Sequence, residues 1–265
     1  MQDYLDGEAA AGRHLVETGE LVAGSMSRAV AGLLFDPSSA VVQLDDRLSA
    51  VLRDAATTAA DLPLTWERAR AGAVLAFAAE LAVTRSHQGR AVRTDGFFSV
   101  RSMARSSAER LVESVVRAAR DTTEDRRVRH LGYLVAEVAV SPDIDPALAD
   151  RALHLAGSCS WRQLALLAAV GRRERAPLPL TPLDDEPRSW RAWGARQDLA
   201  DLQLAGLLDP PPAVPRLGGA VLPRLRPADL RLTRRGVLVH RLLALDFMRE
   251  DDVLTGLADL DLAAS

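Results

Sequence analysis

Apolar residues recur at spacings of three and four along most of the chain, which is the period of an amphipathic α-helix. The clearest example is the segment 41–55, where Val41, Leu44 and Leu48 share one face and charged residues occupy the other. The same period predicts further helices at residues 8–24, 66–85, 103–120, 123–140, 146–157, 161–173, 189–206 and 234–248. The pattern therefore favours a body of short, packed helices.

Several of these helices begin with residues that cap helix N-termini. Thr65, Thr123, Ser160 and Thr233 each precede a periodic segment. A Ser or Thr side chain at this position accepts a hydrogen bond from a backbone N–H of the first turn. Pro146 stands at the first position of its helix, where its missing N–H costs nothing. We expect helices to start at these residues.

The helical period stops between Arg85 and Ser99. The segment SHQGRAVRTDGFF contains two glycines, two arginines and two adjacent phenylalanines. It could be a boundary between two layers of helices or an ordered loop. Because two exposed phenylalanines would be a liability, we expect an ordered loop in which Phe97 and Phe98 plug the core.

Composition agrees with a helical protein without a membrane span. Aromatic residues are 4% of the 265 residues, and alanine and leucine dominate the apolar set, which favours helices over sheets. The most apolar window, residues 71–83, contains Glu80 and is shorter than the about 20 residues of a spanning helix. We expect a buried core helix there. The acidic N-terminus and single cysteine predict a cytoplasmic, reducing location.

The charged residues exclude several classes of enzyme. All 33 basic residues are arginine, because the chain contains no lysine. Pyridoxal enzymes, class I aldolases, Walker-type NTPases and protein kinases need a lysine and are therefore excluded. The missing asparagine and the single isoleucine indicate a GC-rich bacterial genome. The net charge of -3 conceals an acidic segment 1–85, with 7 arginines and 12 acids, and a basic segment 161–249, with 15 arginines and 9 acids.

The composition of the chain changes after the seventh predicted helix, at residues 161–173. Residues 174–188 contain four prolines, and a proline- and glycine-rich stretch follows Gly206, with strand candidates at Val221–Leu225 and Leu230–Thr233. From Glu250 the chain is acidic, and we expect a loose tail. The predicted organisation is a helical body at residues 1–158, a second domain at 159–249 and an acidic tail at 250–265.

Three motifs in the second domain carry a resemblance to a known fold. They are WRQL at residues 161–164 in a first helix, AGLL at 205–208 ending a second, and LTRRG at 232–236 entering a last one. This order, with a hairpin before the last helix, resembles a winged-helix domain of the MarR-like kind. Residues 95–167 also look like a group of bacterial all-helical proteins of no established activity, through DGFF at 95–98, ERLVE at 109–113 and RQLALL at 162–167.

The winged-helix resemblance implies a DNA-binding surface. In such domains the second helix enters the major groove, and arginines of the wing hold phosphates. The candidate DNA-binding residues on the helix are Arg188, Arg191, Arg196 and Gln197, with Asp198 and Asp201 beside them. Those of the wing are Arg216, Arg224, Arg226, Arg231, Arg234 and Arg235, which together with Asp229 give a net charge of +5. Without lysine, arginine must also solubilise the chain, so a solvated or dimerisation surface fits equally.

Candidate catalytic residues are few. Cys159 precedes a helix N-terminus, where a thiolate is stabilised, but a buried cysteine is the more common arrangement. No histidine, cysteine or carboxylate spacing matches a metal site, and we expect neither metal nor cofactor. Trp190 and Trp193 share a helical face, and we expect them to anchor their helix to the core.

Together these features predict a mainly α protein, with a helical body followed by a winged-helix-like C-terminal domain that has a short β-hairpin. The favoured function is a non-catalytic regulatory or scaffold protein that acts through protein–protein contacts, with a partner or by self-association. The alternative is a dimeric winged-helix DNA-binding transcriptional regulator. An enzyme that uses Cys159 is the least favoured reading.

Overall fold

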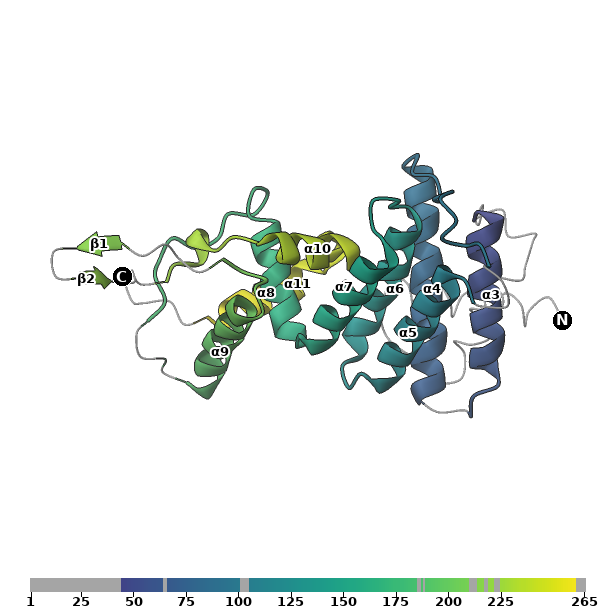
Figure 1. Ribbon diagram of the computed structural model, residues 1–265. Helices are drawn as coiled ribbons and strands as arrows, with labels where there is room; N and C mark the ends of the chain where they lie inside the picture. Colours follow the sequence, from purple (N-terminus) through teal and green to yellow (C-terminus); the bar gives the residue numbers. More distant parts are fainter. Residues whose placement is uncertain are drawn as a thin grey trace. The chain divides into compact units, whose positions relative to one another are not determined.

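The computed structural model describes residues 44–63, 66–100, 105–184, 187, 189–209 and 225–260, and the backbone of 214–216 and 219–221. The helix expected at residues 8–24 and the cap expected at Thr65 lie outside these residues. The chain divides into two compact units between Gly157 and Ser158, and Figure 1 shows the helices of each. In the described part of the chain, no helix combines the length and the apolar character needed to cross a membrane.

The first unit is a set of packed helices around one central helix. Helix α4 (Trp66–His87) contacts α3 (Asp46–Ala60), α5 (Ser107–Asp121) and α6 (Asp125–Ala139), and α7 (Pro146–Ser158) follows. Twelve residues of α4, between Ala69 and Ala82, are buried. A helix that is apolar on all sides belongs in a core, and the core helix expected at residues 71–83 is confirmed.

Helices α4 and α6 approach each other closely at Gly132. A Cβ atom on this residue would lie 2.4 Å from the carbonyl oxygen of Val74 and 2.9 Å from the Cβ of Phe77. Only glycine lets the two backbones come this near without a clash. The alanine-rich surface of α4 therefore does permit the close helix packing that its sequence suggests.

The loop between α4 and α5 is ordered by arginines and phenylalanines. Phe97 is buried and packs edge-on against Phe98, with 5.2 Å between ring centroids. The Arg93 guanidinium lies 4.5 Å from the centre of the Phe97 ring and donates to the carbonyl oxygen of Ile144 at 2.6 Å. Arg90 donates to the buried carboxylate of Glu137 at 3.0 Å. The expected plug is confirmed for Phe97, whereas Phe98 is half-buried.

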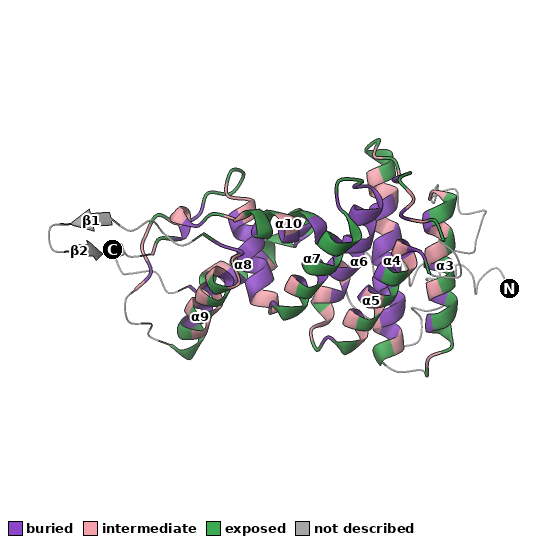
Figure 2. Ribbon diagram, in the orientation of Figure 1, coloured by how far each residue is buried: buried purple, intermediate pink, exposed green. Residues whose placement is uncertain are grey.

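The second unit is built around α8 (Trp161–Gly171), which is buried from Gln163 to Val170 and is purple along most of its length in Figure 2. Helices α9 (Trp190–Leu204), α10 (Arg234–Leu242) and α11 (Glu250–Ala258) and the 3-10 turn η2 (Leu245–Phe247) contact it. The loose tail expected from Glu250 is wrong for residues 250–260, because α11 forms there and Val253 and Leu260 are buried.

The β-hairpin wing of the fold prediction is wrong. The expected strand Leu230–Thr233 does not form: Leu232 makes one isolated bridge to Leu208, and the 3-10 turn η1 (Pro227–Asp229) precedes this segment. Residues 222–224 of the other expected strand, Val221–Leu225, lie outside the described residues. Two three-residue strands, β1 (Val214–Arg216) and β2 (Gly219–Val221), pair with each other, but the residues whose side chains are described contain no β-strand.

The backbone partners of these segments explain why the expected wing is absent. The carbonyl oxygen of Leu225 accepts from the N–H of Leu183 at 2.8 Å, and that of Arg231 accepts from the N–H of Asp209 at 2.9 Å, so these groups are not available for a ladder between the two segments. Pro227, whose fixed φ suits the first position of a tight turn, begins η1 between them. The guanidinium of Arg226 binds the carboxylate of Asp229 across this turn at 2.7 Å and 3.2 Å. The all-α part of the prediction is confirmed.

Candidate functional site

The structure separates the predicted DNA-binding residues of the helix. Arg191 is exposed, but its Nε donates to Oδ1 of Asp259 at 2.7 Å. Arg196 is half-buried on α9, and Gln197 is exposed. Arg188 lies outside the described residues. Gln197 is therefore exposed, but the arginines near it on α9 do not form a row of outward-pointing cations.

The predicted wing arginines belong to a turn and to a helix start. Arg226 binds Asp229, and Arg231 donates to the carbonyl oxygen of Ala228 at 2.6 Å. Arg234 and Arg235 are exposed in the first turn of α10. The side chains of Arg216 and Arg224 lie outside those that the structure describes.

The outer face of α9 exposes large apolar side chains. Trp190 is 86% exposed, Trp193 is 49% exposed and Leu204 is 87% exposed. The indole rings of Trp190 and Trp193 meet edge to face, with 6.0 Å between centroids and an angle of 80°. The expectation that these tryptophans anchor the helix to the core is therefore wrong.

The inner face of α9 holds the helix against α8 without help from the tryptophans. Its buried residues are Ala192, Ala195, Leu199 and Leu202. The Ser189 side chain caps the helix by accepting a hydrogen bond from the N–H of Ala192 at 3.1 Å. Because small and aliphatic residues already form the core contact, Trp190 and Trp193 remain on the outside.

Ion pairs fix the rotation of α9 about its own axis. Arg162 of α8 binds Asp198 of α9 and lies 3.5 Å from a carboxylate oxygen of Asp259, which also binds Arg191. Asp198 and Asp259 are largely buried, so this network is less screened than an ordinary surface pair. A Cβ on Gly194 would lie 2.9 Å from an Nη atom of Arg162. The glycine thus leaves room for Arg162 to reach across α9.

We call the outward stripe of α9 the tryptophan face. Successive helical residues are about 100° apart around the axis, so the stripe can be traced on the sequence. Its members lie within about 60° of one line: Trp190, Trp193, Gln197, Ala200, Asp201 and Leu204. Sequence reasoning missed this surface because it considered one apolar face for the helix, whereas α9 has two.

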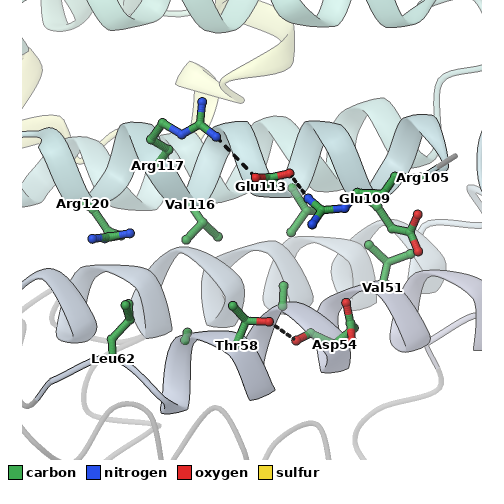
Figure 3. Close-up of a pocket in the computed structure, with 13 residues that line it drawn as sticks. Val51, Asp54, Thr58, Leu62, Arg105, Glu109, Glu113, Val116, Arg117 and Arg120 are labelled. Atoms are coloured by element: carbon green, nitrogen blue, oxygen red, sulfur yellow. Dashed lines mark hydrogen bonds and ion pairs between the residues drawn. The ribbon is translucent and has the colours of Figure 1, made fainter.

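A groove also runs along the first unit between α3 and α5. Its volume is about 310 Å³, and Figure 3 shows Val51, Thr58 and Leu62 on one wall and Val116 on the other. Glu113 on its rim binds both Arg105 and Arg117. The residues that line it include no histidine or cysteine, so an imidazole base and a thiol nucleophile are absent from its described walls.

Buried ionisable groups occur in both units. In the first unit, burial raises the pKa of Glu80. The Tyr133 hydroxyl donates to a carboxylate oxygen of Glu80 at 3.5 Å. In the second unit, burial lowers the pKa of His240. Cys159 is 4% exposed. Among the described residues no group of three or more His, Cys, Asp and Glu side chains is arranged to hold a metal ion.

Comparisons with known proteins provide no relative whose function could be transferred. No family model matches the chain, and no curated protein or solved structure matches it. The geometry of the two units is therefore the basis for a functional proposal.

Proposed function

We propose that this chain is a non-catalytic scaffold or regulatory protein that acts through protein–protein contacts, and that the tryptophan face of α9 is a contact surface. One observation carries the proposal: Trp190, Trp193 and Leu204 are exposed on one stripe of a helix whose core contacts are complete without them. Trp190 and Trp193, whose rings touch, form an exposed apolar patch, and such patches are typical of interaction sites. Tryptophan is also among the residues that contribute most binding energy at protein interfaces.

The shape of the surface favours a macromolecular partner. Small-molecule sites are concave and enclose most of the ligand, whereas the tryptophan face is the convex outer side of a helix. A partner protein can cover such a stripe with a groove or with a helix of its own. The ion pairs between Arg162, Asp198 and Asp259 hold the helix in place, which lowers the entropy lost on binding.

DNA binding by the same helix is less well supported. A helix that reads the major groove needs polar side chains at the centre of its outer face. Here Trp193 and Leu204 are on that face, and Arg191 binds Asp259 instead of pointing into solvent alone. DNA contact by the remaining arginines stays a prediction.

Photo-cross-linking tests the proposed function. A photoreactive amino acid is placed at position 193 and the chain is expressed in the cell that makes it. We expect a discrete adduct with a polypeptide after illumination. The matched control places the same amino acid at position 66, because Trp66 is a similarly exposed tryptophan, at 54%, in the first unit. If position 193 gives no adduct beyond that of position 66, the proposed function is wrong.

A further inference from the structure

We infer that the partner on the tryptophan face is a second copy of this chain, with two α9 helices packed antiparallel about a two-fold axis near Gln197. This inference rests on the proposed function and names its partner. Symmetric pairing by one surface patch is the commonest form of protein self-association. The order of residues along the stripe provides the argument for it.

The two halves of the tryptophan face complement each other. Its N-terminal half carries the bulky rings of Trp190 and Trp193, and its C-terminal half carries Ala200 and Leu204. Gln197 stands midway, because it is seven residues from Trp190 and seven from Leu204. An antiparallel copy places the aromatic half of one helix on the small, aliphatic half of the other. A parallel copy would instead place tryptophan against tryptophan.

The expected contacts follow from the helical geometry. With the axis at Gln197, Trp193 faces Ala200 and Leu204 of the second copy, and Trp190 lies beside Asp201 of that copy. Asp201 is the only charged residue within the stripe. The indole N–H of Trp190 can donate to its carboxylate, which satisfies the charge at the interface. The other charged residues of α9 lie about 100° or more from the centre of the stripe: Arg191, Arg196 and Asp198.

The exposed area of these residues approaches that of a small specific interface. A large aromatic side chain buries about 150–250 Å², so the exposed parts of Trp190, Trp193 and Leu204 amount to roughly 400 Å² in each copy. Two copies would bury roughly 800 Å² from these residues. Gln197, Ala200 and Asp201 add to this, towards the about 1,200 Å² at the lower end of specific interfaces. A concentration-dependent dimer follows, not a permanent one.

Sedimentation of the full chain measures this self-association. We expect the mass to rise from 28.6 kDa towards twice that value as the concentration increases. Trp193→Asp and Leu204→Asp should each raise the dimer Kd at least about 30-fold, and Trp66→Asp, the matched control, should leave it unchanged. A chain that stays monomeric at several hundred micromolar, or a Trp193→Asp variant that dimerises like the parent, overturns the inference.

A complementary pair of variants tests the antiparallel register. Trp193→Arg and Leu204→Asp face each other only in an antiparallel pair, so mixing these two monomeric variants should restore a dimer. If each variant is monomeric and the mixture is too, the register is wrong.

A cysteine at the two-fold axis gives a second test of the register. Gln197→Cys should form a disulfide-linked dimer on oxidation, and Gln88→Cys, an exposed control in the first unit, should not. The buried Cys159 does not compete for this bond.

The contact surface and the identity of its partner can be overturned separately. If the adduct from position 193 has twice the mass of the chain, both the contact surface and its partner are supported. An adduct with a different polypeptide, together with a monomeric purified chain, overturns the inference and leaves the proposed function standing. The absence of any adduct overturns the proposed function itself.

Discussion

At the scale of single residues, Gly171 and His240 depend on each other. A Cβ on Gly171 would lie 2.1 Å from Nε2 of His240, so the imidazole ring fills the space that any other residue would need. Gly171→Ala should therefore lower the free energy of unfolding by about 1–3 kcal/mol, the usual cost of overpacking a core. Chemical denaturation measures this value.

Gly157→Ala is the matched control for that substitution. Gly157 is also in a helix, and a Cβ there would meet nothing within 4 Å. Because alanine has the higher helix propensity, this variant should be as stable as the parent or slightly more so. If both variants lost the same free energy of unfolding, the contact with His240 would not be what restricts position 171 to glycine.

His240 also makes stability depend on pH. Burial lowers its pKa, Asp246 opposes this shift, and the nearby cations Arg172 and Arg175 add to it. Since the folded pKa lies below the unfolded value of about 6.5, the unfolded state binds the proton more tightly. Stability is then complete above about pH 6.5 and falls below it, by up to about 1.4 kcal/mol per pH unit.

The His240→Leu variant isolates this contribution. Urea unfolding of parent and variant between pH 7.5 and 5 should give a steeper loss of stability for the parent as the pH falls below 6.5. Carboxylates titrate equally in both proteins, so the difference between the two slopes reports His240 alone. Identical slopes would show that His240 keeps its ordinary pKa.

Cys159 should be chemically inert in the folded protein. It is 4% exposed, and a thiol needs access to solvent and thiolate character to react. We expect a thiol reagent at neutral pH to label the unfolded chain fully and the folded chain not at all. Rapid labelling of the folded chain would reopen the possibility of an enzyme with a cysteine nucleophile.

At the scale of elements, local sequence determines where most helices begin. Ser160 and Thr233 are confirmed as caps: their hydroxyls accept hydrogen bonds from the N–H groups of Gln163 and Gly236 at 3.2 Å and 3.0 Å. The cap expected at Thr123 is wrong, because α6 begins after Glu124, which makes no side-chain cap. A run of adjacent polar residues offers several starts, and packing selects among them.

Ser160 makes a reciprocal capping box with Gln163. Ser160→Ala removes the acceptor for the Gln163 N–H and should lower the free energy of unfolding by about 1 kcal/mol. Thr57→Ala, on the exposed side of α3, is the control and should be close to neutral. A thermal or urea unfolding curve measures both, and an unchanged midpoint for Ser160→Ala would contradict the role of the cap.

Contacts between distant segments could not be predicted in the same way. The proline- and glycine-rich stretch after Gly206 offers two strand candidates, but the carbonyl oxygens of Leu225 and Arg231 accept hydrogen bonds from Leu183 and Asp209 instead of from each other's segment. Likewise, the sequence shows that Trp190 and Trp193 share a face but not which face is covered. Helix α9 has apolar residues on two sides, and only the burial of the side with Leu199 and Leu202 decides which side remains exposed.

At the scale of the whole molecule, the basic character of residues 161–249 requires its own test. Binding of random-sequence duplex DNA is measured across a salt series for the parent and for the double variant Arg234→Ala/Arg235→Ala. Both of these arginines are exposed. A protein that acts through protein contacts should show no measurable binding at low salt. A steep salt dependence that becomes shallower in the double variant would instead support phosphate contacts, and Arg151→Ala is the control.

The contact made by the tryptophan face is the central claim, and cross-linking from position 193 tests it most directly. It examines the full chain under the conditions in which its partner is present. The account predicts a single adduct from position 193, at twice the 28.6 kDa of the chain, and none from position 66. If position 193 gives no adduct, α9 does not bind a protein through Trp190, Trp193 and Leu204, and the account is contradicted.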